Sequence, residues 1–211
     1  MSGYNLPEEY MEAWCEIKTA ENVLIGIGRV TKIEEKYIII ADKSKELPVV
    51  EPGTLMKINL FSPGKDIRVC IGNIYISSKA EFSLVNILSF VYSEKRNFLR
   101  MDTSIETTAS YRLNSRNLYP DETEVIIKDI SLSGMRFESE TVFPINTIVG
   151  VKLKLKGKKE YCIKCQVVRL IGATNEGFYS YGSKIIFEQD ENSELFCSYM
   201  FEQEREFIKQ K

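Results

Sequence analysis

Two arginines on one short segment are the first residues whose type and spacing could bind a ligand. They are Arg96 and Arg100 in the run Arg96-Asn97-Phe98-Leu99-Arg100, an RxxxR pattern with Lys95 directly before it. A guanidinium is a planar fork that pairs with two phosphate oxygens or with O6 and N7 of guanine, and it also stacks on a base. Two such forks could wrap a compact anion. Taken alone, the same run is typical of a solvated linker.

A second segment brings acceptors to the end of an expected strand. Asp129, Ser131 and Gly134 form the pattern DxSxxG. An ionised aspartate only accepts hydrogen bonds, which suits the N1–H and N2–H donors of guanine, and a serine hydroxyl can donate or accept at the same edge. Gly134 would allow a tight or positive-φ turn and a close approach of ligand to backbone. The alternative interpretation is an ordinary turn in which Asp129 bonds its own backbone.

Other motifs argue against catalysis and metal binding. The 211 residues include no histidine, which excludes a Ser-His-Asp triad, a Cys-His pair and imidazole metal sites. Cys162 and Cys165 form a lone CxxC, and in a strand their odd offset points the two sulfurs to opposite faces. The Gly26-Ile27-Gly28 run lies inside an alternating strand, where a dinucleotide-binding loop does not occur. We therefore expect no catalytic residue, no metal and no cofactor, and no enzyme.

Composition indicates a globular protein of the cytoplasm. The chain has 28 Lys and Arg against 30 Asp and Glu, a formal charge of −2, which argues against broad electrostatic binding to nucleic acid. Its five cysteines are an odd number without a framework pattern, as in a reducing compartment. The N-terminus lacks the basic and apolar pattern of a signal peptide. No apolar run approaches the ~18 residues of a membrane span, so we expect no membrane insertion.

Alternation of apolar and polar residues dominates the chain and predicts half-buried antiparallel strands. Val151 and Leu153, for example, alternate with Lys152 and Lys154. The expected strands are 23–30, 36–41, 54–60, 67–71, 80–92, 123–130, 135–139, 151–155, 161–170 and 183–188. Many short strands separated by turn residues indicate small barrels or sandwiches.

The end of the chain predicts a helix, and its middle predicts a boundary. Over 193–208, apolar residues such as Phe196 and Met200 recur at helical spacing, and Asn192 or Ser193 could cap the start. A long apolar strand ends near Tyr92 in a charged segment. We expect two domains, 1–92 and 93–211, the second including the RxxxR linker at 93–100 and the helix.

The two motifs together, in this order and in a β-rich context that ends in a helix, resemble the PilZ domain, a family of bacterial receptors for cyclic di-GMP. The resemblance covers about 93–207. The N-terminal region is similar to the domain that precedes PilZ in flagellar-brake proteins. The implied fold is mainly β, with an N-terminal flagellar-brake-type barrel, a PilZ barrel, both small and antiparallel, and a C-terminal α-helix.

The resemblance also implies a site and an output. The residues that it assigns to cyclic di-GMP are Lys95, Arg96, Arg100, Asp129, Ser131 and Gly134. Lys95 stands where many members have a further arginine, and it keeps the charge without the planar fork, which leaves open whether one nucleotide or an intercalated pair binds. Tyr181-Gly182-Ser183-Lys184 resembles a late barrel strand of the family. Binding is expected to change the interdomain arrangement and to regulate a partner, by resemblance a flagellar motor or stator protein.

Two alternatives stay open from the sequence. A nucleotide-independent adaptor of the same fold would bind protein through exposed strand edges. A small barrel that binds RNA could use aromatic residues such as Phe98 and Tyr111, although the net charge of −2 disfavours it.

Overall fold

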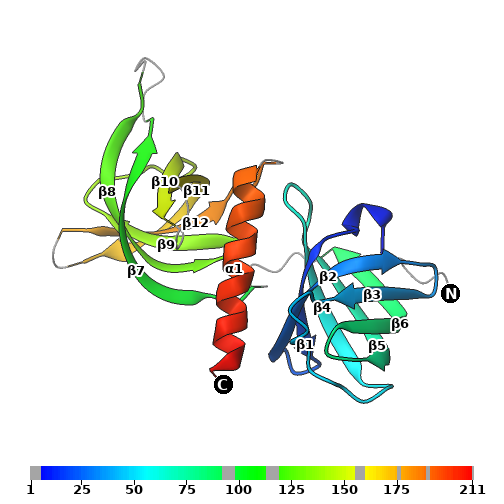
Figure 1. Ribbon diagram of the computed structural model, residues 1–211. Coiled ribbons are helices and arrows are strands. Elements are labelled where there is room, and N and C mark those ends of the chain that lie inside the picture. Colours follow the sequence, from blue (N-terminus) through cyan, green and yellow to red (C-terminus); the bar gives the residue numbers. More distant parts are fainter. Residues whose placement is uncertain are drawn as a thin grey trace. The chain divides into compact units, whose positions relative to one another are not determined.

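The protein is described here by a computed structural model, which divides into two compact units (Figure 1). The first consists of Met1–Asn97 with Phe201–Lys211, and the second of Phe98–Met200. The residues that the structure describes are 6–91, 98–112, 119–154, 160–174, 177–188 and 191–210. Lys95 and Arg96 therefore lie outside the described residues.

The first unit is a closed antiparallel barrel whose strands follow the order β1-β2-β3-β6-β5-β4. A short 3-10 helix, η1 (Glu8–Tyr10), precedes it. The strands are β1 (Trp14–Thr19), β2 (Leu24–Ile33), β3 (Tyr37–Ala41), β4 (Leu55–Phe61), β5 (Arg68–Ser77) and β6 (Glu81–Val91). Every second residue points inward, so Ile38 and Ile40 of β3 and Ile58 and Leu60 of β4 fill the core. Closure pairs both edges of the sheet.

The second unit repeats this architecture with the strand order β10-β11-β12-β9-β8-β7. Its strands are β7 (Met101–Tyr111), β8 (Asp121–Ser131), β9 (Gly134–Ser139), β10 (Ile148–Lys154), β11 (Glu160–Ala173) and β12 (Tyr179–Ile185). In its core, Phe137 and Phe143 pack around Tyr181 with ring centroids 5.4–5.5 Å from it. The Tyr181 hydroxyl accepts from the Phe143 amide at 3.0 Å and donates to the Thr141 carbonyl at 3.2 Å, which satisfies its polar end inside the barrel.

One α-helix, α1 (Glu191–Lys209), ends the described chain. Its buried residues recur every three or four positions: Ser193, Phe196, Cys197, Met200, Phe201 and Glu204. Its residues from Phe201 onward belong to the first unit, where Phe201 stacks on Trp14 with the ring centroids 4.7 Å apart. Arg205 pairs with Asp42 at 2.7 Å and Lys209 with Glu46 at 2.9 Å.

The predicted mainly-β fold of two small barrels with a C-terminal helix is confirmed. Two strands, β1 and β7, were not predicted. The expected capping role of Asn192 or Ser193 was wrong, because both residues lie inside the first turn of α1 and the Ser193 hydroxyl accepts instead from the Glu188 amide at 3.3 Å. The CxxC prediction holds: on β11 Cys162 is exposed and Cys165 is buried.

Candidate functional site

The DxSxxG segment forms the hairpin that joins β8 to β9. Ser131 pairs with Gly134, so only Leu132 and Ser133 make the turn between the strands. The buried Ser131 hydroxyl donates to the Gly134 carbonyl at 3.1 Å and lies 3.3 Å from the Ser133 hydroxyl. The turn is therefore held by its own serine, and the end of β8 is fixed in place.

Gly134 is required by packing rather than by its backbone conformation. The sequence predicts a tight or positive-φ turn, and the structure shows the tight one, since the φ of Gly134 is not among the positive values of the described chain. A methyl group at this position would lie 2.2 Å from the Ser183 carbonyl oxygen of β12. Glycine is thus the residue that lets β9 approach β12 at the point where the turn begins.

Asp129 is the centre of the site and binds two arginines. Its Oδ1 lies 3.0 Å from Nη1 of Arg100, and its Oδ2 lies 2.7 Å from Nε of Arg136. Asp129 is 7% exposed, whereas the side chains of Arg100 and Arg136 are 42% and 39% exposed. A nearly buried carboxylate thus holds two guanidiniums that still face solvent.

This arrangement carries one uncompensated positive charge among the three side chains. Each guanidinium has five N–H donors and the carboxylate has about four acceptor positions. Each arginine uses one nitrogen in its ion pair with Asp129. Donors therefore remain for an anionic or base-edge acceptor. Such charge-assisted contacts are the stronger class of hydrogen bond.

The structure brings together four of the residues predicted for the site: Arg100, Asp129, Ser131 and Gly134. The other two, Lys95 and Arg96, lie outside the described residues. Lys184 is exposed on β12, in register with Gly134.

Sequence reasoning missed Arg136, although a signal for it exists. In a hairpin that pairs Ser131 with Gly134, the antiparallel register places residue 136 opposite residue 129. Directly opposed residues of opposite charge stabilise each other. A basic residue two positions after the motif glycine could therefore have been paired with Asp129.

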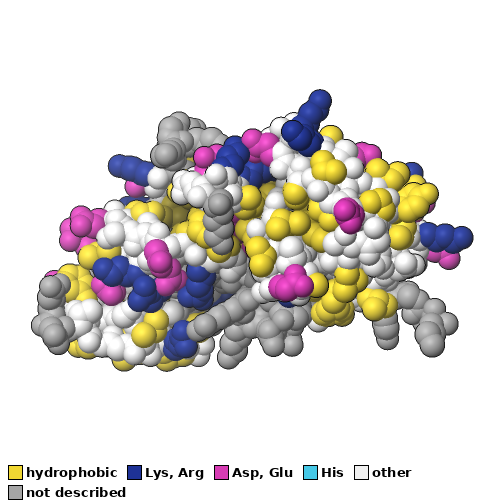
Figure 2. Space-filling view, turned by 90° about the horizontal axis from the view of Figure 1, so that it is seen from below, with side chains coloured by type: hydrophobic (Ala, Val, Ile, Leu, Met, Phe, Trp, Pro, Cys, Tyr) yellow, Lys and Arg dark blue, Asp and Glu magenta, His cyan; other side chains and the backbone are white. Residues whose placement is uncertain are grey.

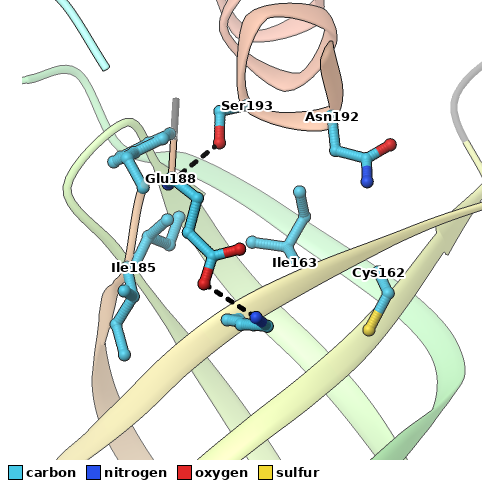
Figure 3. Close-up of a pocket in the computed structure, with 9 residues that line it drawn as sticks. Cys162, Ile163, Ile185, Glu188, Asn192 and Ser193 are labelled. Carbon is cyan, nitrogen blue, oxygen red and sulfur yellow. Dashed lines mark hydrogen bonds and ion pairs between the residues drawn. The ribbon is translucent and has the colours of Figure 1, made fainter. Parts of the chain in front are cut away.

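A small pocket of about 200 Å³ lies elsewhere on the second unit (Figure 3). Its apolar lining includes Ile163 and Ile185, and within it Glu188 pairs with Lys164 at 2.7 Å. Burial raises the pKa of the Cys162 thiol at its edge, so that thiol is mainly protonated at neutral pH. The pocket includes none of the predicted site residues, and it is smaller than the ~300–1,000 Å³ of most small-molecule sites.

The described residues include no group of three or more cysteines and carboxylates that could hold a metal ion. Within the same ranges, no helix has the length and apolar character needed to cross a membrane.

Comparison with known proteins gives one family. A model described as the PilZ domain matches residues 94–202, just over half of the chain. No curated protein is significantly similar to it.

Solved structures that match most of the chain do so at low identity. MrkH of K. pneumonia, in complex with c-di-GMP, is 16% identical, with a TM-score of 0.39, 95% of this chain covered and 90% of that one. YcgR of Escherichia coli, also in complex with c-di-GMP, is 9% identical, with a TM-score of 0.42 and coverages of 96% and 89%. The Bacillus subtilis inhibitor of motility MotI/DgrA is 11% identical, with a TM-score of 0.40 and coverages of 95% and 99%. Likenesses at this level carry no ligand or partner over to the chain.

Proposed function

The chain belongs to the PilZ domain family, and from this premise we propose that it is a receptor for cyclic di-GMP, with the nucleotide on the outer face of the second barrel. The observation that carries the proposal is the pairing of Asp129 with both Arg100 and Arg136 at 3.0 and 2.7 Å. An acceptor of guanine donors and two forks for phosphate or guanine are thereby held together next to a fixed turn. These are the groups that the two guanines and two phosphates of the ligand require.

When the nucleotide binds on this face, Asp129 would exchange its contacts with the two arginines for contacts with the ligand, or would share its oxygens between them. Its carboxylate would accept from guanine N1–H and N2–H, and the donors of Arg100 and Arg136 would turn to phosphate or to guanine O6 and N7. Ser131 and Gly134 would shape the turn beside the ligand. The Ser131 hydroxyl already donates to the Gly134 carbonyl, and the absence of a side chain at Gly134 lets β12 lie close to β9. By the resemblance, Lys95 and Arg96 would add further contacts to the nucleotide.

This set of residues suits the binding of a ligand without catalysis. The chain has no histidine, which is the most frequent general acid or base, and the proposed ligand contacts are forks and acceptors that need no proton transfer. A cytoplasmic location is supported by its five cysteines, all of which are free. We therefore propose a non-enzymatic effector of the cytoplasm that uses no cofactor.

The proposed output is a change in the arrangement of the two domains that alters binding to a protein partner. Arg96 and Arg100 lie at the junction of the two units in the sequence, and a ligand that binds both would restrict this segment. A ligand shifts such an equilibrium by its differential contacts in the two states. A flagellar motor or stator protein is the partner that we propose by the resemblance to flagellar-brake proteins.

Isothermal titration with cyclic di-GMP tests the ligand. The wild type is expected to bind, and Arg100→Ala or Asp129→Ala should weaken binding by roughly tenfold to more than a hundredfold, since each removes a charge-assisted contact. Lys154→Ala is the matched control, because it removes one exposed positive charge from β10. Cyclic di-AMP should bind weakly, since adenine lacks the N1–H and N2–H donors. No heat from the wild type with cyclic di-GMP at millimolar concentration would overturn the proposal.

Small-angle scattering with and without saturating cyclic di-GMP tests the proposed change in arrangement. The wild-type curve should change and the Arg100→Ala curve should not. Identical curves for the saturated and free wild type would contradict a rearrangement while leaving the receptor proposal intact.

An adaptor role that needs no nucleotide is favoured by one specific observation. Hydrophobic side chains reach solvent on two adjacent strands of the first barrel, Tyr75 and Ile76 on β5 and Leu88 and Phe90 on β6. Figure 2 shows hydrophobic side chains gathered on the right-hand part of the face drawn, and acidic and basic side chains mixed elsewhere. Binding of the motor or stator partner to the same extent with and without nucleotide, and by Arg100→Ala, would support the adaptor instead.

A further inference from the structure

A row of outward-facing residues crosses four strands of the second barrel and ends on an arginine that the motifs do not include. Asp129 of β8 pairs with Arg136 of β9, Arg136 with Gly182 of β12, and Gly182 with Arg169 of β11. Directly paired residues point to the same side of a sheet. Arg169 therefore lies on the same face as the proposed site, although it is 40 positions from Asp129 in the sequence.

Gly182 has no side chain, so the side chain of Arg169 can lie directly over its backbone. A methyl group at Gly182 would sit 3.1 Å from Nε and 3.2 Å from Cγ of Arg169. The stem of Arg169 thus leans over β12, from β11 toward β9, and passes through space that any other residue at position 182 would restrict. Arg169 is itself exposed.

The charge at this end of the row has no acidic counterpart. Asp129 compensates one of its two arginine partners, and within the described ranges no carboxylate forms an ion pair with Arg169. Three guanidiniums and two carboxylates share this face, since Asp102 of β7 is paired in register with Asp129, and the group keeps a net positive charge. Adjacent strands are ~4.8 Å apart, so the row spans about 14 Å from β8 to β11. This is the dimension of a dinucleotide rather than of a single phosphate.

We propose that Arg169, supported by Gly182, binds a phosphodiester of the cyclic di-GMP whose guanine is held at Asp129. The inference rests on the proposed function and adds a contact from β11, a strand that carries neither motif. Gly182 is a positioning residue, since its part is to leave room for the arginine stem.

Titration of matched variants tests the contact. Arg169→Ala should weaken binding of cyclic di-GMP by roughly tenfold or more, as expected for the loss of a charge-assisted contact, and Arg169→Lys should recover part of it, because it keeps a point charge without the fork. Gly182→Ala should also weaken binding while Arg169 is still present. The control Lys154→Ala removes a charge near the far end of β11, where Lys154 pairs with Glu160, ~30 Å along the strand from Arg169. It should bind as the wild type does.

The outcomes separate this inference from the proposed function. Thermal unfolding of Arg169→Ala should match that of the wild type, which excludes a purely structural effect. If Arg100→Ala loses affinity and Arg169→Ala keeps it, the inference is wrong and the receptor proposal stands. If the wild type itself binds no cyclic di-GMP, both are wrong.

Discussion

Glu204 of α1 and Glu16 of β1 are two fully buried carboxyl groups that lie against each other inside the first unit. Glu16 is well supplied with partners: Lys18 lies 2.6 Å from its Oε2, and Asn59 donates to the same oxygen at 2.8 Å. No described residue donates a hydrogen bond to either oxygen of Glu204. Two carboxyl groups can form a hydrogen bond only when one of them holds a proton, and Glu204 is the one without another partner.

We expect the stability of the first unit to fall as pH rises because of this pair. Burial raises the pKa of Glu204 well above its ordinary value, the charge of Glu16 raises it further, and Lys18 lowers it. Arg205, the next residue along the helix, pairs with Asp42 at 2.7 Å. A raised folded-state pKa gives stability that is complete below the unfolded value of about 4.3 and is lost as pH rises through the folded-state value.

Urea unfolding followed by the fluorescence of Trp14, the only tryptophan, measures this effect between pH 5 and 8. The wild type should lose up to about 1.4 kcal/mol per pH unit from this one proton, and Glu204→Gln should show a flatter dependence. Glu202→Gln, on the exposed side of the same helix, is the control and should follow the wild type. Equal slopes for Glu204→Gln and the wild type would show that Glu204 is ionised when buried.

Removal of the Phe201 ring should destabilise the first unit. Phe201 is fully buried and stacks on Trp14 at 4.7 Å with an interplanar angle of 17°. Phe201→Ala should cost about 3–5 kcal/mol of unfolding free energy, the usual range for a buried phenylalanine, and should shift Trp14 emission to longer wavelength. The control is Phe207→Ala on the same helix, where the side chain is 37% exposed. Equal losses for the two variants would contradict a specific contribution of the stack.

Gly134→Ala should destabilise the second unit through a backbone clash. The added methyl group would lie 2.2 Å from the Ser183 carbonyl oxygen, which cannot move away as a flexible side chain can. Overpacking of this kind costs about 1–3 kcal/mol or more. Gly172→Ala is the matched control, because nothing lies within 4 Å of its added group. Differential calorimetry should show a lower transition temperature for Gly134→Ala alone, and equal temperatures for both variants would mean that β9 and β12 are not this close.

Most strands could be predicted from the sequence, because their core residues alternate with exposed ones, as in β3 and β10. β1 was not predicted although Cys15 and Ile17 alternate with Glu16 and Lys18 over its short length. The burial of these two charged residues reflects tertiary environment, which local periodicity does not contain. β7 was not predicted because Ala109 is its one fully buried residue in the described chain, which leaves little apolar pattern.

The residues of the candidate site also fall into those that the sequence could predict and those that it could not. The DxSxxG residues are local and their hairpin follows from their spacing, whereas Arg136 and Arg169 join Asp129 only through the pairing of β8, β9, β12 and β11. The helix offers a similar case: its apolar stripe ends on Glu204, an acid in a position where the period requires a buried residue. The apolar residues of the helix alone would predict that Phe207 belongs to the buried stripe, whereas Phe207 is 37% exposed.

Thiol labelling should distinguish one accessible cysteine from four inaccessible ones. Cys162 is exposed, while Cys15, Cys70, Cys165 and Cys197 are buried. Burial raises the pKa of Cys70 and of Cys165 to about 11, which suppresses their thiolates. At pH 8 Ellman's reagent should react quickly with one equivalent in the native protein and with five in denaturant. Cys162→Ser should abolish the fast phase, and its persistence would show that another cysteine is accessible.

Arg136→Ala should weaken cyclic di-GMP binding without unfolding the barrel. Its side chain is 39% exposed and its Nε–H points to Asp129 Oδ2 at 2.7 Å, so its removal frees an oxygen that water can reach and leaves Arg100 on Oδ1. The carboxylate therefore keeps a cationic partner after the substitution and is not left as a buried unpaired charge, so the unfolding midpoint should change little. Under the proposed function, affinity should fall by roughly tenfold or more.

Comparison with Lys128→Ala makes the Arg136 result specific. Lys128 is the neighbour of Asp129 in sequence and pairs with Glu138 at 3.3 Å, so its removal deletes one positive charge from the same hairpin without touching the carboxylate of Asp129. If Arg136 acts by its fork, Arg136→Lys should stay weak and Lys128→Ala should bind normally. Equal weakening by Arg136→Ala and Lys128→Ala would mean that the hairpin contributes only its overall charge, and that the pairing of Arg136 with Asp129 does not form part of the nucleotide site.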